Sequence, residues 1–229
     1  MQFKGNRQFD SAELQQGDNM KLGDIKIEAL KLMFVNYNID IDIKDIASYL
    51  QDENYASYLV NMPGAINRCF ANIEERGVLP SKSYTLKAEE GLASPSFIRF
   101  DLPSIIDDFF AVERIVYESD NDYDGDHDYR MEGDTLVLEH FDEERETFIV
   151  LYKPKIERVL ATTDNDTEIE IPDNIAVHIP YFIKGDLYRD DEPNEASEAR
   201  NWYEAAMESI VSARDNKIGK VKSTYKQTV

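Results

Sequence analysis

The sequence contains one cysteine, three histidines and ten glycines in 229 residues, and it has no long apolar run. A lone cysteine, Cys69, excludes a disulfide framework and is typical of proteins from a reducing compartment. Because a membrane-spanning helix needs about 18 or more consecutive apolar residues, none is expected. The scattered glycines fit neither a phosphate-binding loop nor a dinucleotide-binding turn.

Charge, by contrast, is abundant and unevenly distributed. The formal net charge is −21, yet the last sixteen residues, 214–229, contain five basic side chains and one acid and carry +4. The rest of the chain therefore carries −25 and should repel nucleic-acid phosphates rather than bind them. A protein with this charge could surround DNA without adhering to it, although the acidity could equally serve solubility alone.

The stretch 171–213 predicts two amphipathic helices around which the rest of the chain is organised. Asp173 is placed to cap the first helix, and Pro193 lies near the start of the second, where its missing N–H costs nothing. Each helix has an apolar face at helical spacing, formed by Ile175, Ile179, Phe182, Ile183 and Leu187 and then by Ala199, Trp202, Tyr203, Ala206, Ile210 and Ala213. An antiparallel helical hairpin of this kind needs another element to cover its apolar faces.

The N-terminal part predicts the helices that supply this cover. Asp24 is expected to cap a first helix, and residues 43–50 form a short second one. A long helical pattern begins near Asn54, with either a kink or a restart at Pro63. Gly77 is expected to end this helix in a left-handed conformation. The resulting core should bring together residues from both ends of the chain: Ile66, Cys69, Phe70, Ile179, Phe182 and Trp202.

Between these helical parts the hydrophobic period changes to two. Short runs rich in β-branched and aromatic residues, such as 97–100, 135–139 and 146–153, alternate with turn residues and predict an antiparallel sandwich or barrel. The predicted fold is α+β, a discontinuous helical bundle with an inserted β module. The expected parts are an N-terminal arm (1–21), a helical core domain (22–80 and 170–213), the inserted β domain (81–169) and a basic C-terminal arm (214–229).

No catalytic apparatus is predicted. The three histidines, His127, His140 and His178, are distant from Cys69 in sequence, and no nucleophile elbow is present. Cys69 lies on the apolar face of its helix, as buried structural thiols do. Carboxylates are so numerous that pairing any two of them carries no information. The chain is therefore predicted not to be an enzyme and to need no cofactor.

One loop suggests a cation site. Asp120, Asp122 and Asp124 are followed by Gly125, which matches the first half of a calcium-binding loop. The twelfth position, where a bidentate glutamate belongs, is Met131, and the flanking runs read as strands. A true EF-hand is thus not expected, and either a looser Ca²⁺ site or a solvated hairpin loop is left open.

The basic C-terminal arm is the second candidate site. Its cationic residues alternate with apolar ones, which fits either a frayed terminus or an arm that docks on a partner. The residues expected to make that contact are Arg214, Lys217, Ile218, Lys220, Val221, Lys222, Tyr225 and Lys226.

Three runs resemble the head–tail connector (adaptor) proteins of tailed bacteriophages. They are Leu59-Val-Asn-Met-Pro-Gly-Ala-Ile-Asn-Arg-Cys-Phe70, Gly77-Val-Leu-Pro-Ser-Lys82, and the run from Ile179-Pro-Tyr-Phe-Ile-Lys-Gly-Asp-Leu-Tyr-Arg to Trp202-Tyr203. The similarity spans roughly residues 22–213, and the last run is its most specific part. The two charged ends lie outside it.

The resemblance implies a non-enzymatic virion protein of the phage neck, made in the host cytoplasm. Such a protein forms a ring, a dodecamer, between the portal protein and a downstream tail, stopper or nozzle protein. Genomic double-stranded DNA passes through without specific binding, and the ring gives the tail a platform. By position only, residues 214–229 would be the arm that reaches the portal. Two alternatives stay open: another neck or tail component that attaches fibres, and a calcium-binding protein.

Overall fold

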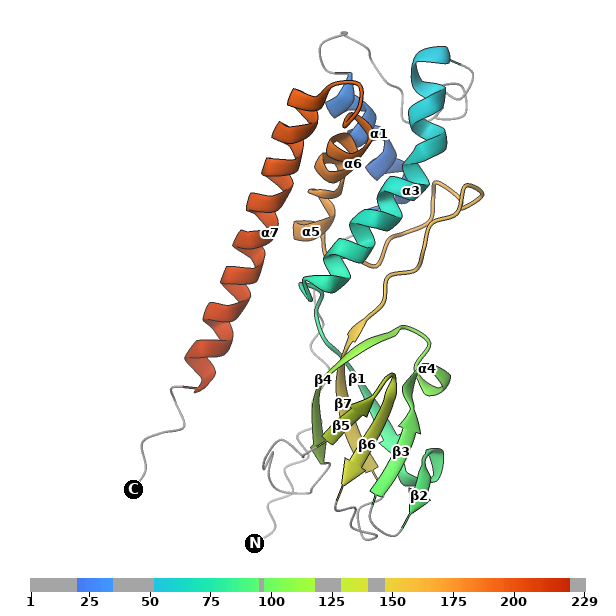
Figure 1. Ribbon diagram of the computed structural model, residues 1–229, viewed down its shortest axis with the longest axis vertical. Helices are drawn as coiled ribbons and strands as arrows, with labels where there is room; N and C mark the ends of the chain where they lie inside the picture. Colours follow the sequence, from blue (N-terminus) through green and yellow to red (C-terminus); the bar gives the residue numbers. More distant parts are fainter. Residues whose placement is uncertain (1–19, 35–51, 95–96, 118–128, 140–146, 223–229) are drawn as a thin grey trace, which may run out of the picture.

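The computed structural model describes residues 20–34, 52–94, 97–117, 129–139 and 147–222, and it confirms the α+β class (Figure 1). Helices α1, α3, α5 and α6 and the start of α7 lie at one end of the elongated molecule, and the strands lie at the other. The predicted helix 43–50 and the calcium loop lie outside the described residues.

The helical part combines segments from both ends of the chain. These are α1 (Leu22–Met33), α3 (Glu53–Glu75), α5 (Asp173–Ala176), α6 (Ile179–Leu187) and α7 (Pro193–Lys222). Helix α6 lies between the others, packed against α1, α3 and α7. One hydrophobic cluster, here called the helical core, includes Ile66, Cys69, Phe70, Ile179 and Phe182, as predicted.

Helix boundaries differ from prediction where local chemistry was misjudged. Lys21, not Asp24, is the N-cap of α1, and Asp24 lies in the first turn. Asp173 is likewise the first residue of α5, whose N-cap is Pro172. The single helix expected after Asp173 is two helices, because Pro180 occupies the first turn of α6 and has no N–H to continue the preceding one. Helix α3, by contrast, continues through Pro63 without a restart, and Figure 1 shows that the helix changes direction along its length.

Two glycines have a structural requirement. Gly77 follows α3 with φ +58°, the left-handed conformation that the sequence predicted. Gly185 lies where α6 meets α7, and a Cβ added there would stand 3.1 Å from the carbonyl oxygen of Ala196. A hydrogen at this position therefore lets the two helices of the hairpin approach closely.

The strands lie between α3 and α5 in sequence. They are β1 (Lys82–Lys87), β2 (Leu92–Ser94), β3 (Phe97–Asp101), β4 (Phe109–Tyr117), β5 (Tyr129–Glu132), β6 (Thr135–Glu139) and β7 (Thr147–Pro154), with a 3-10 turn (Ala88–Glu90) and the short helix α4 (Leu102–Ile105) among them. Two antiparallel sheets have the orders β1-β7-β4 and β2-β3-β6-β5. Strands β2 and β5 were missed by the sequence analysis, since both are only three or four residues long.

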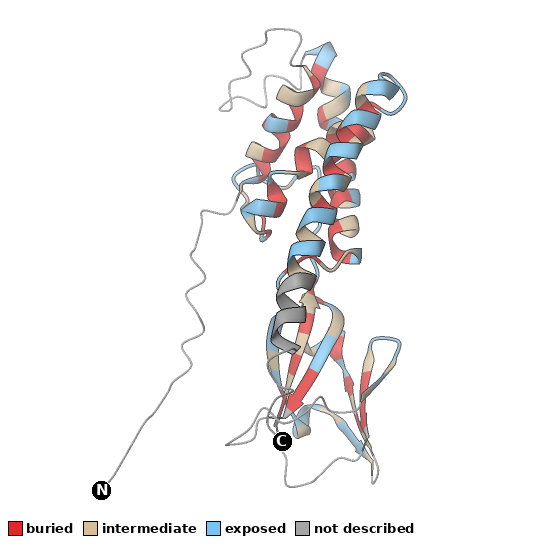
Figure 2. Ribbon diagram, turned by 90° about the vertical axis from the view of Figure 1, so that its left-hand side faces the viewer, coloured by how far each residue is buried: buried red, intermediate tan, exposed pale blue. Residues whose placement is uncertain are grey.

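Residues 82–154, here called the β module, have their own hydrophobic cluster. Side chains from both sheets share it, and Phe100 of β3 meets Phe148 of β7 edge-on with ring centroids 6.2 Å apart. The predicted limit at residue 169 is too late, because Ile156, Val159 and Ile169 are buried in the helical core instead. Figure 2 shows buried residues in both parts, with exposed residues on the outward sides of the helices.

Candidate functional site at the junction

The chain crosses between the two cores at residues 76–81 and 155–172. These two connections, together with the side chains they contact, are here called the junction. It is the place where three distant segments meet: the end of α3, the β1-β7-β4 sheet and the late turns of α7. We therefore describe it as the candidate site of the molecule.

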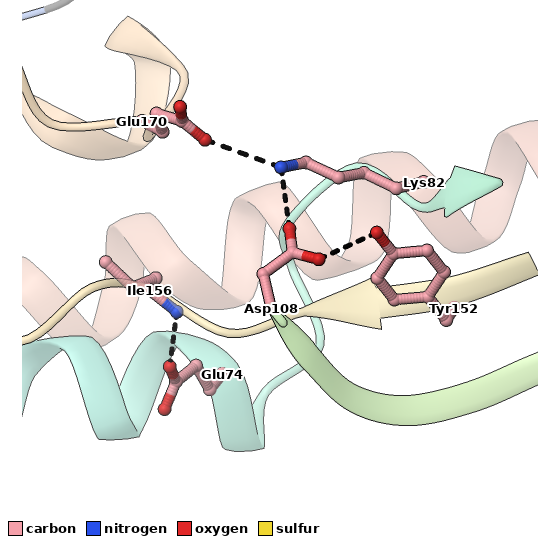
Figure 3. Close-up of polar contacts among 6 residues, drawn as sticks. All are labelled: Glu74, Lys82, Asp108, Tyr152, Ile156 and Glu170. Atoms are coloured by element: carbon pink, nitrogen blue, oxygen red, sulfur yellow. Dashed lines mark hydrogen bonds and ion pairs between the residues drawn. The ribbon is translucent and has the colours of Figure 1, made fainter. Parts of the chain in front are cut away.

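Glu74 fixes the return connection to the end of α3. Its side chain is only 2% exposed, and one carboxylate oxygen accepts a hydrogen bond from the Ile156 N–H at 2.6 Å (Figure 3). The other oxygen accepts one from the Arg158 guanidinium. Two turns earlier in α3, Asn67 both donates to and accepts from the backbone of Val159, each at 2.8 Å. The segment 156–159 is thus held along α3 by side chains that mimic backbone pairing.

A second group of contacts surrounds Asp108, in the turn before β4. One oxygen of Asp108 lies 2.7 Å from the Lys82 ammonium, and the other accepts a 2.7 Å hydrogen bond from the Tyr152 hydroxyl. Lys82 also lies 3.4 Å from Glu170, so it links the β module to the connection that re-enters the helical core (Figure 3).

These contacts change the protonation equilibria of both Asp108 and Tyr152. Burial alone would raise the pKa of Asp108, but the hydrogen bonds from Lys82 and Tyr152 outweigh it, and the pKa lies below its usual value. Burial, reinforced by the neighbouring carboxylate, raises the pKa of Tyr152. Asp108 is therefore an anion at neutral pH and Tyr152 a neutral donor to it.

The third group brings α7 into the junction. Arg214 donates to the carbonyl oxygen of Gly77, the residue that ends α3, and its guanidinium lies 3.8 Å from Glu113 of β4. Glu113 also accepts a hydrogen bond from Ser81 and lies 3.6 Å from the ammonium of Lys153. Arg214 thus joins the last described side chains of α7 to both the helical core and the β module.

A cavity of about 540 Å³ lies beside these contacts, lined by Lys82, Asp108, Ile156, Arg158, Glu168 and Glu170 among others. Of its charged residues, Lys82 pairs with Asp108 and Glu170, and Arg158 pairs with Glu74 outside the cavity lining. The ion pairs and hydrogen bonds of the junction fix the β module against the helical core.

No protein-family model matches the chain, and no curated protein matches it.

Trp202 is the one predicted core residue that the structure contradicts. It is 63% exposed, whereas its neighbour Tyr203 is completely buried, 5.0 Å from Phe182 between ring centroids. Successive residues in a helix are rotated by about 100°, so a one-residue error moves a side chain off the buried face. Within residues 193–214, the part of α7 whose burial the structure describes, the buried positions are Ala196, Ala199, Tyr203 and Met207.

The predicted C-terminal arm does not begin at residue 214. Helix α7 continues to Lys222, and Arg214 is engaged within its own chain. The side chains of 215–229 lie outside the described residues, so contact of Lys217, Ile218, Lys220, Val221, Lys222, Tyr225 and Lys226 with a portal stays a prediction.

The calcium site also stays a prediction, since Asp120, Asp122 and Asp124 are not described. Within the described ranges no three His, Cys, Asp or Glu side chains are grouped to hold a metal ion. Within the same ranges, no helix is long and apolar enough to span a membrane.

Glu74, Asp108 and Arg214 were not identified as junction residues from the sequence. Glu74 offered one signal: it follows Cys69, Phe70 and Ile73 on the apolar face of a helix, where an acid needs a partner. Asp108 offered no such signal, because nothing in the sequence distinguishes it from the other 45 acidic residues.

Proposed function

We propose that this chain is a structural protein of a phage neck, which forms a ring, a dodecamer, between the portal and the tail. The ring extends the DNA channel and gives the next tail component a platform. The protein acts by assembly and not as an enzyme, and it needs no cofactor.

The observation that carries this proposal is where the connector-like runs lie in the fold. Residues 59–70 belong to α3, and residues 179–203 form α6 and the first turns of α7, with Gly185 of α6 facing the backbone of Ala196 in α7. Helix α6 packs against both α3 and α7. These two connector-like runs are thus parts of one packed unit. The remaining run, 77–82, is the connection from that unit to the β module.

The surface of α7 and the charge of the chain support the same proposal. The outer side of α7 exposes Trp202, and tryptophan is enriched at the centres of protein interfaces. A body with a charge of −25 would line a channel through which DNA moves without binding. Channel and interface are the two surfaces that a ring subunit requires.

The test is electron microscopy of the chain co-expressed with the portal protein of the same phage. We expect twelvefold rings stacked on the portal. The chain alone could stay monomeric, so the portal must be present. Free chain beside bare portals would contradict the proposal. Location at the base of the tail would instead favour a neck or tail component that attaches fibres through the β module.

A further inference from the structure

A groove lies on the surface of the helical part and adjoins the junction at Glu168, which lines both this groove and the junction cavity. It has a volume of about 820 Å³ and is bordered by α1, α5 and the first turn of α6. Its apolar lining residues are Met20, Leu32, Val177, Pro180 and Tyr181. Val177 is 45% exposed, so part of this lining is open to solvent.

Acidic side chains border this apolar surface. Asp24, Glu28, Glu168 and Asp173 line the groove, against a single cation, Lys21. Lys21 is paired with Asp166 at 3.0 Å, and Glu28 with Lys31 at 2.8 Å. In the described ranges no ion pair engages Asp24, Glu168 or Asp173. The groove is therefore suited to a segment that is both basic and apolar.

The chain itself contains a segment of this chemistry. After Asp215 the sequence has four lysines and no acid, and Ile218, Val221 and Tyr225 follow one another at intervals of three and four residues. An amphipathic helix with an apolar stripe at this spacing is the form that binds in a groove. The helix already extends to Lys222.

The segment leaves its own helical core, because Arg214 is bound at Gly77, beside the junction. Figure 1 shows α7 running past the helical core on the way to its C-terminal end. The groove of α1, α5 and α6 belongs to that helical core. A second copy is therefore the better placed partner.

We propose that the C-terminal segment 217–226 of one copy docks in the α1–α5–α6 groove of a second copy. The choice of a second copy depends on the ring proposed above, in which every subunit has neighbours. The same residues were predicted from the sequence to reach the portal, so the two assignments compete.

The first experiment uses a fluorescent synthetic peptide of residues 214–229 and the full-length chain, with binding followed by anisotropy. We expect saturable binding that weakens with added salt. Glu28→Lys combined with Glu168→Lys should weaken binding about tenfold or more, because like charges then face each other. Glu198→Lys combined with Glu208→Lys makes the same charge change on the exposed side of α7 and should have little effect. Equal loss in both variants would show a mere net-charge effect and overturn the proposal.

The second experiment identifies which copy supplies the segment. Val177→Cys and Val221→Cys are placed in separate chains of different size and mixed under mild oxidation. Cys69 is fully buried and burial raises its pKa to about 12, so it should stay unreacted. We expect a mixed disulfide between the two chains.

Other outcomes overturn the proposal in distinguishable ways. A concentration-independent internal disulfide in the doubly substituted chain would identify the chain's own segment as the occupant. Peptide binding retained in the groove variant but lost on deleting residues 1–19 would place the segment elsewhere. Binding to purified portal and not to the chain would support the portal arm. If no disulfide forms while rings still assemble on the portal, the groove proposal fails and the proposed function stands.

Discussion

The helical core and the β module are built from the sequence in opposite ways. The β module comes from one continuous segment, and its buried cluster needs no residue outside 82–154. The helical core unites Leu22 to Leu79 with Ile156 to Met207, so it closes only after the intervening segment has been spanned. Closing such a long loop costs conformational entropy that the buried contacts must offset. Separate cores of this kind should respond separately to mutation.

The junction differs from both cores in what holds it together. Apolar side chains stabilise each core, whereas charged side chains connect the two parts. Lys82 pairs with Glu170, Arg214 lies near Glu113, and Lys153 donates a hydrogen bond to the carbonyl oxygen of Leu79. Hydrophobic burial is insensitive to modest changes of pH, while carboxylate contacts are not. The orientation of the β module should therefore be more sensitive to pH than either core is.

The largest effect is expected at the adjacent aromatic residues of α7. Tyr203→Ala should lower the free energy of unfolding of the helical core by about 3–5 kcal/mol, because it leaves a cavity beside Phe182. Trp202→Ala, next to it, should change this free energy by less than about 0.5 kcal/mol, because the side chain is 63% exposed. Urea unfolding followed by far-UV circular dichroism compares the two. Equal effects would mean that Trp202 is buried in the isolated chain.

The next effect tests the independence of the β module. Leu138→Ala removes a fully buried side chain of β6 and should lower the free energy of unfolding of the β module by about 2–5 kcal/mol. Hydrogen exchange should then show lost protection in β3, β6 and β7, with α1, α3 and α6 unchanged. Leu92→Ala, at a 79% exposed position of β2, is the control. Simultaneous loss of protection in the helices would show that the two cores unfold as one unit.

A smaller effect is expected at Glu74. Glu74→Ala leaves the Ile156 N–H without its acceptor and should cost about 1–3 kcal/mol. Glu75→Ala, the exposed neighbour in the same helix, should cost far less. Thermal unfolding measures both. If Glu74→Ala had no effect, segment 156–159 would be held by Asn67 and its apolar contacts alone.

The smallest effect concerns pH. The pKa of Asp108 is depressed in the folded state, so its contribution to stability is complete above the unfolded pKa, near 3.8, and is lost as the pH falls through the folded value. Asp108→Asn should reduce stability at pH 7 by at most about 1 kcal/mol, since the ion pair is partly exposed. It should also flatten the decline in stability below pH 4, measured by urea unfolding at several pH values. A profile identical to that of the unsubstituted chain would exclude a role for Asp108.

The sequence by itself determined the features that depend on residues close to one another along the chain. The period of apolar residues predicted α3, α6 and α7, the change to period two predicted most strands, and Gly77 marked the end of α3, because propensity and amphipathicity act within a few residues. The pairing of both chain ends in one core also followed, since neither helical part could cover its apolar face alone.

Tertiary structure decided what depends on distant partners. Whether Trp202 or Tyr203 faces the core is a difference of one helical step, and only packing against Phe182 and Cys69 resolves it. Likewise, Glu74, Asp108 and Arg214 resemble many other charged residues until the fold places Ile156, Lys82 and Gly77 beside them. Charge pairing acts through space between residues far apart in sequence, so one-dimensional patterns could not reveal the junction.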